Sequence, residues 1–398
     1  MGGGFEPIVG AAHVQAPLAA DLDGAPISQV ISPADADEVA ECMRLATLDS
    51  IPLVVRGGGS KLCWGNVGAA ATWVVLDVSR LSTSIEIDVD EGIAQVAAGV
   101  RTSVLEARLS ELGRRTQIPE GHVGSTVGGS VAADPPGARR TLDTALRHDL
   151  LGLEVVLADG SRTRCGARVV KNVTGFDLVR LYCGSFGTLG VLTEITLRLR
   201  PLPAVQRCLH RRLRTIEEAQ RVISQLSARG VQADGALVRA AGEAEVLWLL
   251  EGSDSDVRER SERVTGDELE PSAWAAAARP VPAEPASDRA VIRVCGRPSD
   301  VAEIWRSLES FAGAASVGPA FPLTGVVWAR VNPKQLSALC AHASARSWTW
   351  LIESLPTAQK RGRDVFGPAS SALPLLRLIK QRFDPRGVLA PGRFMAGI

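Results

Sequence analysis

Residues 121–133 read GHVGSTVGGSVAA, and this stretch decides how the rest of the chain is interpreted. It combines four glycines with Ser and Thr hydroxyls and otherwise small aliphatic side chains. Such a stretch has little apolar surface to bury, so it makes a poor core. Its exposed backbone makes a good wall for a flat or phosphorylated ligand. The alternative interpretation is a mobile glycine loop without a ligand.

A second glycine loop, RGGGSK at residues 56–61, follows a short apolar run that predicts a strand. Three consecutive glycines allow several backbone N–H groups to turn toward one point and form an anion nest. Arg56, Ser60 and Lys61 would add charge and a hydroxyl at its rim. A plain tight turn is the competing interpretation. The loop is neither a Walker A motif nor a G-x-G-x-x-G fingerprint.

A third loop, GSFGTLG at residues 184–190, precedes an alternating run at 191–199 that predicts a long strand. Its glycines are three residues apart, so it does not match the Rossmann fingerprint either. A single glycine loop beside a strand can be explained as a plain turn. Three such loops are harder to explain in this way. Together they favour an extended cofactor that carries a pyrophosphate.

Composition limits the remaining function classes. The chain has 398 residues, 45% hydrophobic and 22% charged, which is typical of a globular protein of two or three domains. Basic and acidic residues number 44 each, so no net charge draws the protein to nucleic acid or to an anionic membrane. Any anion must therefore be held locally.

The sequence also carries compartment signals. The seven cysteines are an odd number without a C-x-x-C pair, which favours reduced thiols. The N-terminus lacks a basic region followed by an apolar stretch, and no apolar run approaches the ~20 residues that span a bilayer. We therefore expect a cytoplasmic protein that meets a membrane only through partners.

The pattern along the chain predicts the domain organisation. We expect a loose arm at 1–32, an α+β domain at 33–202, a second domain at 203–355 and a closing segment at 356–398. Ser32 is the predicted N-cap of the first helix. Further predicted helices cover 102–112, 217–228 and 373–383. Predicted strands cover 52–55, 73–76, 93–97, 153–157 and 162–165, the last two as a hairpin around Asp159-Gly160. The charged, Ala- and Pro-rich stretch 253–289 predicts a surface excursion.

Taken in order, these loops and their neighbours resemble the FAD-binding domain of the vanillyl-alcohol oxidase and p-cresol methylhydroxylase (PCMH) flavoproteins. The stretches that carry the resemblance are RGGGS from 56, GSTVGGSVA from 124, LGLEVVLADG from 151, KNVTGFDLVRL from 171 and GSFGTLGVLTE from 184. FDPRGVLAPGR at 383–393 is similar to the terminal signature of the FAD-linked 2-hydroxyacid oxidase branch. Within that branch, KNVTGFD and the short middle region look most like the FAD-binding E subunit of glycolate oxidase.

The resemblance implies an α+β fold in two parts. A PCMH-type FAD-binding domain would be joined to a smaller α/β cap domain, and a C-terminal segment would return to the FAD domain. The implied activity is FAD-dependent oxidation of a small 2-hydroxy acid, glycolate to glyoxylate. In such a complex a second flavin subunit would carry the substrate chemistry, and an iron-sulfur subunit would take the electrons.

The resemblance also assigns cofactor-binding residues in all three loops. These are Arg56, Gly57, Gly58, Gly59, Ser60, Lys61, Gly124, Ser125, Thr126, Gly128, Gly129, Ser130, Gly187, Gly190 and Val191. Family members with covalent flavin carry a His just after the first loop's glycines. Ser60 stands there in this chain, so we predict non-covalent FAD. The terminal signature usually reads Asn-Pro-Gly, whereas residue 390 here is Ala.

The catalytic base is not assigned by the sequence. Hydroxy acid oxidation requires removal of the hydroxyl proton, usually by a His near the flavin. Related proteins carry a His-rich, often metal-binding cluster in the later domain, but residues 203–398 contain only His210 and His342. We therefore expect no metal site, and His122 in the glycine loop is the remaining candidate base.

Two alternatives stay open. One is a self-sufficient FAD-linked dehydrogenase of another hydroxy acid or alcohol, with His122 or Tyr182 as base. The other is a non-redox assembly subunit that keeps the fold without flavin, for which Ala390 is the only hint.

Overall fold

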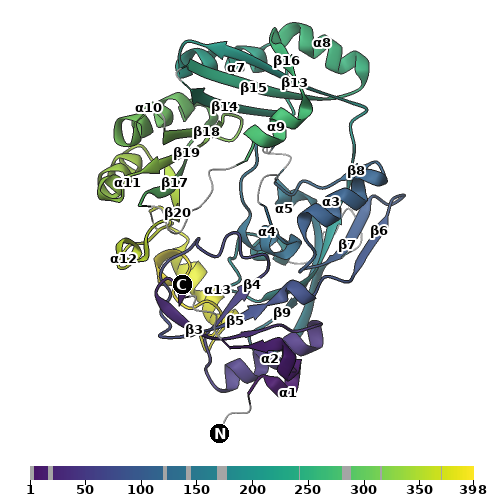
Figure 1. Ribbon diagram of the computed structural model, residues 1–398, viewed down its shortest axis with the longest axis vertical. Coiled ribbons are helices and arrows are strands. Elements are labelled where there is room, and N and C mark those ends of the chain that lie inside the picture. Colours follow the sequence, from purple (N-terminus) through teal and green to yellow (C-terminus); the bar gives the residue numbers. More distant parts are fainter. Residues whose placement is uncertain are drawn as a thin grey trace.

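The computed structural model describes residues 4–16, 21–119, 123–139, 145–167, 177–241, 243–279, 288–313, 316–368 and 370–398. Figure 1 shows two parts stacked along the long axis. We call residues 4–201 the N-terminal part and residues 205–354 the cap. The C-terminal helices return beside the N-terminal part, next to its strands β3 and β4.

The first sheet of the N-terminal part has the strand order β1-β3-β5-β4, with β2 paired to β3. Its strands are β1 (Val14–Gln15), β2 (Asp21–Leu22), β3 (Ala25–Ile31), β4 (Leu53–Arg56) and β5 (Trp73–Asp77). β3 and β4 both run parallel to β5. The predicted loose arm is therefore wrong. Residues 25–31 instead form β3, which pairs with the distant strand β5, and Phe5, next to α1 (Glu6–Val9), is 3% exposed.

Helix α2 (Ala36–Leu48) packs on this sheet and begins later than predicted. Asp35, not Ser32, is its N-cap, because the Asp35 carboxylate accepts hydrogen bonds from the N–H groups of Asp37 and Glu38 at 2.9 Å. Glu38 in turn accepts from the N–H of Ala34 at 2.7 Å. A carboxylate satisfies the free N–H groups of the first turn better than a hydroxyl three residues earlier can.

The second sheet has the order β10-β9-β11-β7-β6, and its pairs are antiparallel. The predicted hairpin is confirmed, and Gly160 at its turn has φ +78°. The strands are β6 (Ile85–Asp88), β7 (Ile93–Ala97), β9 (Leu150–Val156), β10 (Arg162–Gly166) and β11 (Val191–Arg198), and β8 (Arg114–Arg115) pairs with β12 (Arg200–Pro201). The helices of this region are α3 (Thr102–Glu111), α4 (Val127–Ala133), α5 (Leu146–Asp149) and α6 (Leu178–Tyr182).

The cap is built on one sheet with the order β16-β13-β15-β14-β18-β19-β17-β20, antiparallel in its described pairs. Its strands are β13 (Val205–Leu213), β14 (Gly235–Ala241), β15 (Glu243–Gly252), β16 (Asp267–Leu269), β17 (Ala290–Cys295), β18 (Val317–Phe321), β19 (Val326–Val331) and β20 (Thr349–Ser354). Its helices are α7 (Ile216–Ala228), α8 (Asp254–Val264), α9 (Pro271–Ala277), α10 (Val301–Ala312) and α11 (Leu336–Ala345). The predicted surface excursion at 253–289 is thus wrong for α8, whose Val257 and Val264 are in the core, and for α9, whose Trp274 is. Leu269 of β16 also packs against the core.

The C-terminal segment carries α12 (Thr357–Lys360) and α13 (Leu373–Phe383), the latter with the predicted bounds. After α13 the backbone runs along the edge strand β4, where Leu53 N–H donates to Val388 O at 2.7 Å and Ala390 N–H donates to Leu53 O at 2.8 Å. The last residues therefore belong to the N-terminal part.

Within the described residues, every helix is too short or too polar to cross a bilayer.

Candidate functional site

The three glycine loops lie around one cavity of about 110 Å³. We call residues 56–61 loop 1, residues 123–133 loop 2 and residues 184–190 loop 3. Loop 1 follows β4, residues 127–133 of loop 2 form the helix α4, and loop 3 precedes β11. Loops 1 and 3 are more than 100 residues apart in sequence, yet they line the same cavity. They do so because the elements that carry them end at the same side of the N-terminal part.

Loops 1 and 2 interlock through positions where only glycine fits. A Cβ added to Gly58 would lie 1.7 Å from the carbonyl oxygen of Gly124, and one added to Gly57 would lie 2.2 Å from Thr126 Oγ1. Side chains complete the junction, since Lys61 Nζ donates to Ser125 Oγ at 2.8 Å and the hydroxyls of Ser60 and Ser125 lie 3.0 Å apart. The loops therefore behave as one rigid unit.

Loop 1 presents a run of unused hydrogen-bond donors. None of the backbone N–H groups of residues 57–61 donates to an acceptor within the described parts of the chain. In loop 2, by contrast, the N–H groups of Val127 and Gly128 donate to Val100 and Ala98, and that of Gly129 donates to Thr126 Oγ1. Unpaired donors on a glycine backbone are what an anion nest requires, so loop 1 meets this requirement better than loop 2 does.

Loop 3 is fixed from two sides. Gly184 and Phe186 donate their N–H groups to carbonyls of α4, Val131 O and Ala132 O. From the other side, Lys380 of α13 donates from Nζ to Thr188 O at 2.9 Å and to the carboxylate of Asp384 at 2.6 Å. Gly187 lies beside Val55 of β4 and has φ +70°, a backbone conformation that residues with a side chain rarely adopt. The loop is thus held between α4, β4 and the C-terminal segment.

The end of the chain clamps the residues that follow loop 1. The Arg393 guanidinium donates to Leu62 O at 2.6 Å and to Trp64 O at 3.0 Å, and pairs with Asp23 at 2.7 Å. Asp23 also binds Lys360 at 2.7 Å, a residue only 2% exposed. Three distant parts of the sequence therefore meet behind loop 1.

The cap adds charged groups to the same place. Glu353 of β20, 2% exposed, accepts from Trp328 Nε1 at 3.1 Å and lies 3.3 Å from Arg293. The Arg293 guanidinium stacks over the Trp64 ring at 5.4 Å. Burial lowers the pKa of Lys61 to about 8, partly offset by Glu353, and burial raises the pKa of Glu353 itself.

Among the described residues, the charges around loop 1 do not balance. Four basic side chains gather there against two acidic ones; they are Lys61, Arg293, Lys360 and Arg393 against Asp23 and Glu353. Buried positive charge without a counterion is costly. A bound dianion such as a pyrophosphate would supply the missing charge.

The predicted cofactor residues fall into two groups. Those that line the cavity are Arg56, Gly57, Gly58, Gly59, Ser60, Lys61, Thr126, Gly128, Gly129, Gly187 and Gly190. The others do not line it. Ser125 and Ser130 are buried beside it, Val191 is 0% exposed in the core with Val156, and Gly124 lines a second, larger cavity. The Arg56 guanidinium is held by Asp77 at 2.8 Å, which neutralises its charge.

Sequence reasoning missed several residues of the wall. Trp64, Phe186, Leu192 and Arg393 also line the cavity. The ring centroids of Trp64 and Phe186 lie 6.4 Å apart. Phe186 in turn contacts Phe366, with their ring centroids 5.3 Å apart. Arg393 is the last residue of the terminal signature at 383–393, and its place in that motif could have identified it as a cavity residue. The aromatic residues give no sequence signal, because their partners come from three separate segments.

None of the groups considered as catalytic base lines the small cavity in the described chain. Tyr182 is 1% exposed and packs on Phe383 at 5.9 Å, with its hydroxyl unpartnered among the described residues. His210 pairs with Glu245 at 2.9 Å and His342 bonds Ser307 at 3.0 Å, both within the cap. His122, like Lys171 and Asn172, lies outside the described residues. Within the described chain no cluster of three His, Cys, Asp or Glu residues could hold a metal ion.

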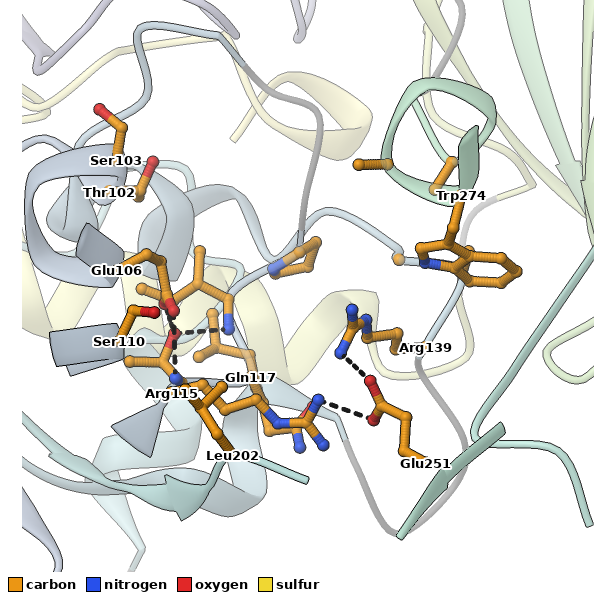
Figure 2. Close-up of a pocket in the computed structure, with 18 of the residues that line it drawn as sticks. Thr102, Ser103, Glu106, Ser110, Arg115, Gln117, Arg139, Leu202, Glu251 and Trp274 are labelled. Carbon is orange, nitrogen blue, oxygen red and sulfur yellow. Dashed lines mark hydrogen bonds and ion pairs between the residues drawn. The ribbon is translucent and has the colours of Figure 1, made fainter. Parts of the chain in front are cut away.

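A second cavity of about 570 Å³ lies where the cap meets the N-terminal part. Figure 2 shows the Glu251 carboxylate between the guanidinium groups of Arg115 and Arg139. The distances are 2.7 Å to Arg115 and 2.6 Å to Arg139, and Gln206 donates to the same carboxylate at 3.0 Å. Glu251 comes from the cap and the arginines from the N-terminal part, so this cluster joins the two.

Comparison with known proteins agrees with this architecture. Residues 27–166 match the family model of an FAD binding domain. The fold is similar to p-cresol methylhydroxylase with a TM-score of 0.74 at 16% identity, covering 98% of this chain and 95% of that one. The chain therefore carries a PCMH-type FAD-binding domain in a mixed α+β fold, and FAD is its cofactor.

More specific similarity comes from curated relatives. The chain is 31% identical over 237 residues to glycolate oxidase subunit GlcE of Escherichia coli (strain K12), covering 59% of this chain and 65% of that protein. It is 32% identical over 200 residues to glycolate oxidase subunit GlcD of Bacillus subtilis (strain 168), covering 50% and 42%. D-lactate dehydrogenase of Archaeoglobus fulgidus is 36% identical over 172 residues, covering 43% and 38%. The chain thus spans less than two thirds of the length of these relatives.

Proposed function

We propose that loop 1 binds the pyrophosphate of a non-covalent FAD. The observation that carries this proposal is the run of unused N–H groups at residues 57–61 beside an excess of buried positive charge. Thr126, Gly128 and Gly129 of loop 2 and Gly187 and Gly190 of loop 3 would border the cofactor. Ser60, where covalent members have His, offers no imidazole for a flavin bond.

When bound, FAD supplies the two-electron acceptor for oxidation at a C–OH carbon. In the chain itself, the Lys61 ammonium would offset phosphate charge, and the loop 1 amides would donate hydrogen bonds to the phosphate oxygens. The interlocked backbones of Gly58 and Gly124 keep these donors in place without a conformational cost at binding. The buried rings of Trp64 and Phe366 and the partly buried ring of Phe186 would shield the cofactor from water.

We further propose that the protein is the FAD-binding subunit of a cytoplasmic glycolate oxidase complex. A second flavin subunit would carry the substrate chemistry, and an iron-sulfur subunit would accept the electrons. The names of the two glycolate oxidase subunits among the relatives support this assignment. The positions of Tyr182, His210 and His342 away from the small cavity agree with a subunit that depends on partners.

Purification of the full chain tests the cofactor proposal. The expected protein is yellow, and acid precipitation releases all its flavin into the supernatant. A flavin retained in the precipitate would contradict non-covalent binding, and a colourless protein that does not take up added FAD would favour the assembly-subunit alternative.

Dye reduction tests the subunit proposal. The isolated flavinated chain should reduce dye with glycolate far more slowly than the same chain purified with its co-expressed partner subunits. Equal rates with and without partners would instead establish a self-sufficient dehydrogenase.

A further inference from the structure

We propose that the exposed side of helix α13 is a docking surface for another protein subunit, one that presents acidic side chains around an apolar centre. We call this surface the α13 face; it consists of Leu375, Arg377, Leu378, Arg382 and Arg386. That the docked protein is a subunit of the same complex rests on the proposed function. The surface itself follows from the packing and charge of the helix.

Helix α13 is apolar on more sides than it covers. Six of its eleven residues are Leu, Ile or Phe, yet none of the eleven is buried. Ile379 and Phe383 pack on the N-terminal part, where the ring centroids of Phe383 and Tyr182 lie 5.9 Å apart. On the other side, Leu375 is 58% exposed and Leu378 is 63% exposed. Because a helix that is apolar all round is ordinarily covered all round, the outer side of α13 lacks the cover that such a helix needs.

The exposed leucines are neighbours on the helix. Leu375, Leu378 and Arg382 have the spacing i, i+3 and i+7, so they form one stripe along α13. Among the exposed large apolar residues of the described chain, Leu375 and Leu378 are the two that lie one helical turn apart. Single apolar residues scattered over a surface are ordinary, whereas adjacent ones with a polar rim mark an interaction site.

The charge of the α13 face selects the partner. Arg377, Arg382 and Arg386 are exposed, and none of their guanidinium groups pairs with a carboxylate in the described chain. The helix contains no acidic residue, and Asp384 just after it is buried and bound to Lys380. A partner with Asp or Glu side chains around an apolar centre therefore matches this face in charge and in polarity.

Two other occupants match the face less well. In a symmetric dimer of this chain the face would meet itself, which would bring like-charged arginines together. A bilayer would gain little, because two leucine side chains supply about eight carbon atoms, fewer than the roughly 14 of a myristoyl chain, which alone binds membranes only marginally. Interfaces between proteins are enriched in Arg and depleted in Lys, Asp and Glu, as the α13 face is.

The α13 face also lies close to the cofactor cavity. On its inner side the helix holds loop 3, since Lys380 Nζ donates to Thr188 O at 2.9 Å, and Gly187 of the same loop lines the small cavity. Figure 1 shows this helix in yellow beside the N-terminal part. A subunit docked on the α13 face would therefore be separated from loop 3 by one helix, about 10 Å thick.

Binding measurements on the full chain test the docking surface. The probe is the purified second flavin subunit together with the iron-sulfur subunit, titrated with the wild-type chain or a variant in biolayer interferometry, with and without added FAD. Leu378→Glu should weaken binding about tenfold or more, because a carboxylate would replace the apolar centre and face the partner's acidic groups. Arg382→Glu should weaken it about fivefold or more, and wild-type affinity should fall as NaCl rises from about 50 to about 300 mM.

Matched controls make the same changes elsewhere on the surface. Leu48→Glu replaces a leucine at the end of α2 that is 79% exposed, and Arg221→Glu replaces an exposed arginine of α7. Both variants should keep the wild-type affinity for the partner subunits. Leu378→Glu should keep the wild-type melting temperature and FAD content, so that its weaker binding reports the surface and not unfolding.

The outcomes separate this proposal from the proposed function. A wild-type complex that Leu378→Glu leaves intact would overturn the docking surface alone, and a wild-type chain that binds neither subunit would overturn the subunit function as well. Self-association of the chain that Leu378→Glu abolishes would assign the face to a second copy, and Leu378-dependent binding to phosphatidylserine vesicles would assign it to a membrane; either would overturn the proposal. Leu378-dependent docking by a chain that takes up no FAD would support the surface and refute the cofactor proposal.

Discussion

At the scale of single residues, the protonation of Lys61 should make FAD binding depend on pH. Its ammonium donates to Ser125 Oγ at 2.8 Å, and burial lowers its pKa to about 8. The charged form therefore predominates below pH 8 and is lost as pH rises through that value. Because the bound pyrophosphate is negative, FAD binding should be favoured by the charged form.

We predict that the Kd for FAD is nearly constant below about pH 7 and rises by up to about tenfold per pH unit above pH 8. Lys61→Met should bind FAD more weakly at pH 7 and lose this pH dependence. Fluorescence titration of the apoprotein between pH 6.5 and 9.5 measures both. The exposed Lys334→Met is the control and should keep the wild-type profile; an unchanged profile in Lys61→Met would contradict the role assigned to Lys61.

At the scale of elements, the contact between loops 1 and 2 depends on the absence of side chains. A Cβ on Gly58 would lie 1.7 Å from a backbone oxygen that cannot move away alone. Gly58→Ala should therefore push the loops apart at a cost of about 1–3 kcal/mol and weaken FAD binding about tenfold or more. Flavin content after dialysis and the Kd for FAD are the measurements.

The matched control for the loop is Gly4→Ala, where a Cβ meets nothing within 4 Å. This variant should keep wild-type flavin content. Wild-type affinity in Gly58→Ala would mean that the loops do not act as one rigid unit.

Helix α13 offers a second test at this scale. Lys380 Nζ donates to Thr188 O, to Leu389 O at 2.7 Å and to the Asp384 carboxylate, which is 0% exposed. Lys380→Met leaves that carboxylate buried without its counterion, so the free energy of unfolding should fall by about 3–5 kcal/mol. Urea denaturation followed by circular dichroism measures the loss.

Arg377→Met, on the exposed side of the same helix, should change the free energy of unfolding by less than about 0.5 kcal/mol. A comparably small loss in Lys380→Met would show that the C-terminal segment does not hold loop 3 in place.

At the scale of the whole molecule, Glu251 joins the cap to the N-terminal part. Its side chain is 4% exposed and is bound by Arg115 and Arg139. Glu251→Gln removes the charge that both guanidinium groups face, so the interface should weaken by about 2 kcal/mol or more. Hydrogen exchange should rise in β8 and β15 together, and Glu243→Gln, exposed on the same strand, should leave exchange unchanged. Increased exchange confined to one side would contradict a role at the interface.

Much of the fold could be predicted from local patterns. The hairpin of β9 and β10 follows from Asp159-Gly160 between apolar runs, and α13 begins and ends where its apolar spacing does. The strand β3 and the helices α8 and α9 could not be predicted, because their segments gain stability from packing on distant residues rather than from their own periodicity. Asp35 caps α2 in place of Ser32 because the helix begins at Ala36, where the Asp35 carboxylate reaches the free N–H groups of the first turn.

By itself, the sequence predicted three glycine loops beside strands and favoured an extended cofactor as their ligand, since the freedom of a Cβ-free backbone is a local property. Only the tertiary structure shows that the loop 1 amides have no acceptor among the described residues, while the Val127 and Gly128 amides of loop 2 donate to Val100 and Ala98. It also brought Glu353 and Arg293 of the cap to Lys61, and Arg393 to Trp64. These contacts join residues that are hundreds of positions apart in sequence. They depend on burial and charge, so no local sequence pattern predicts them.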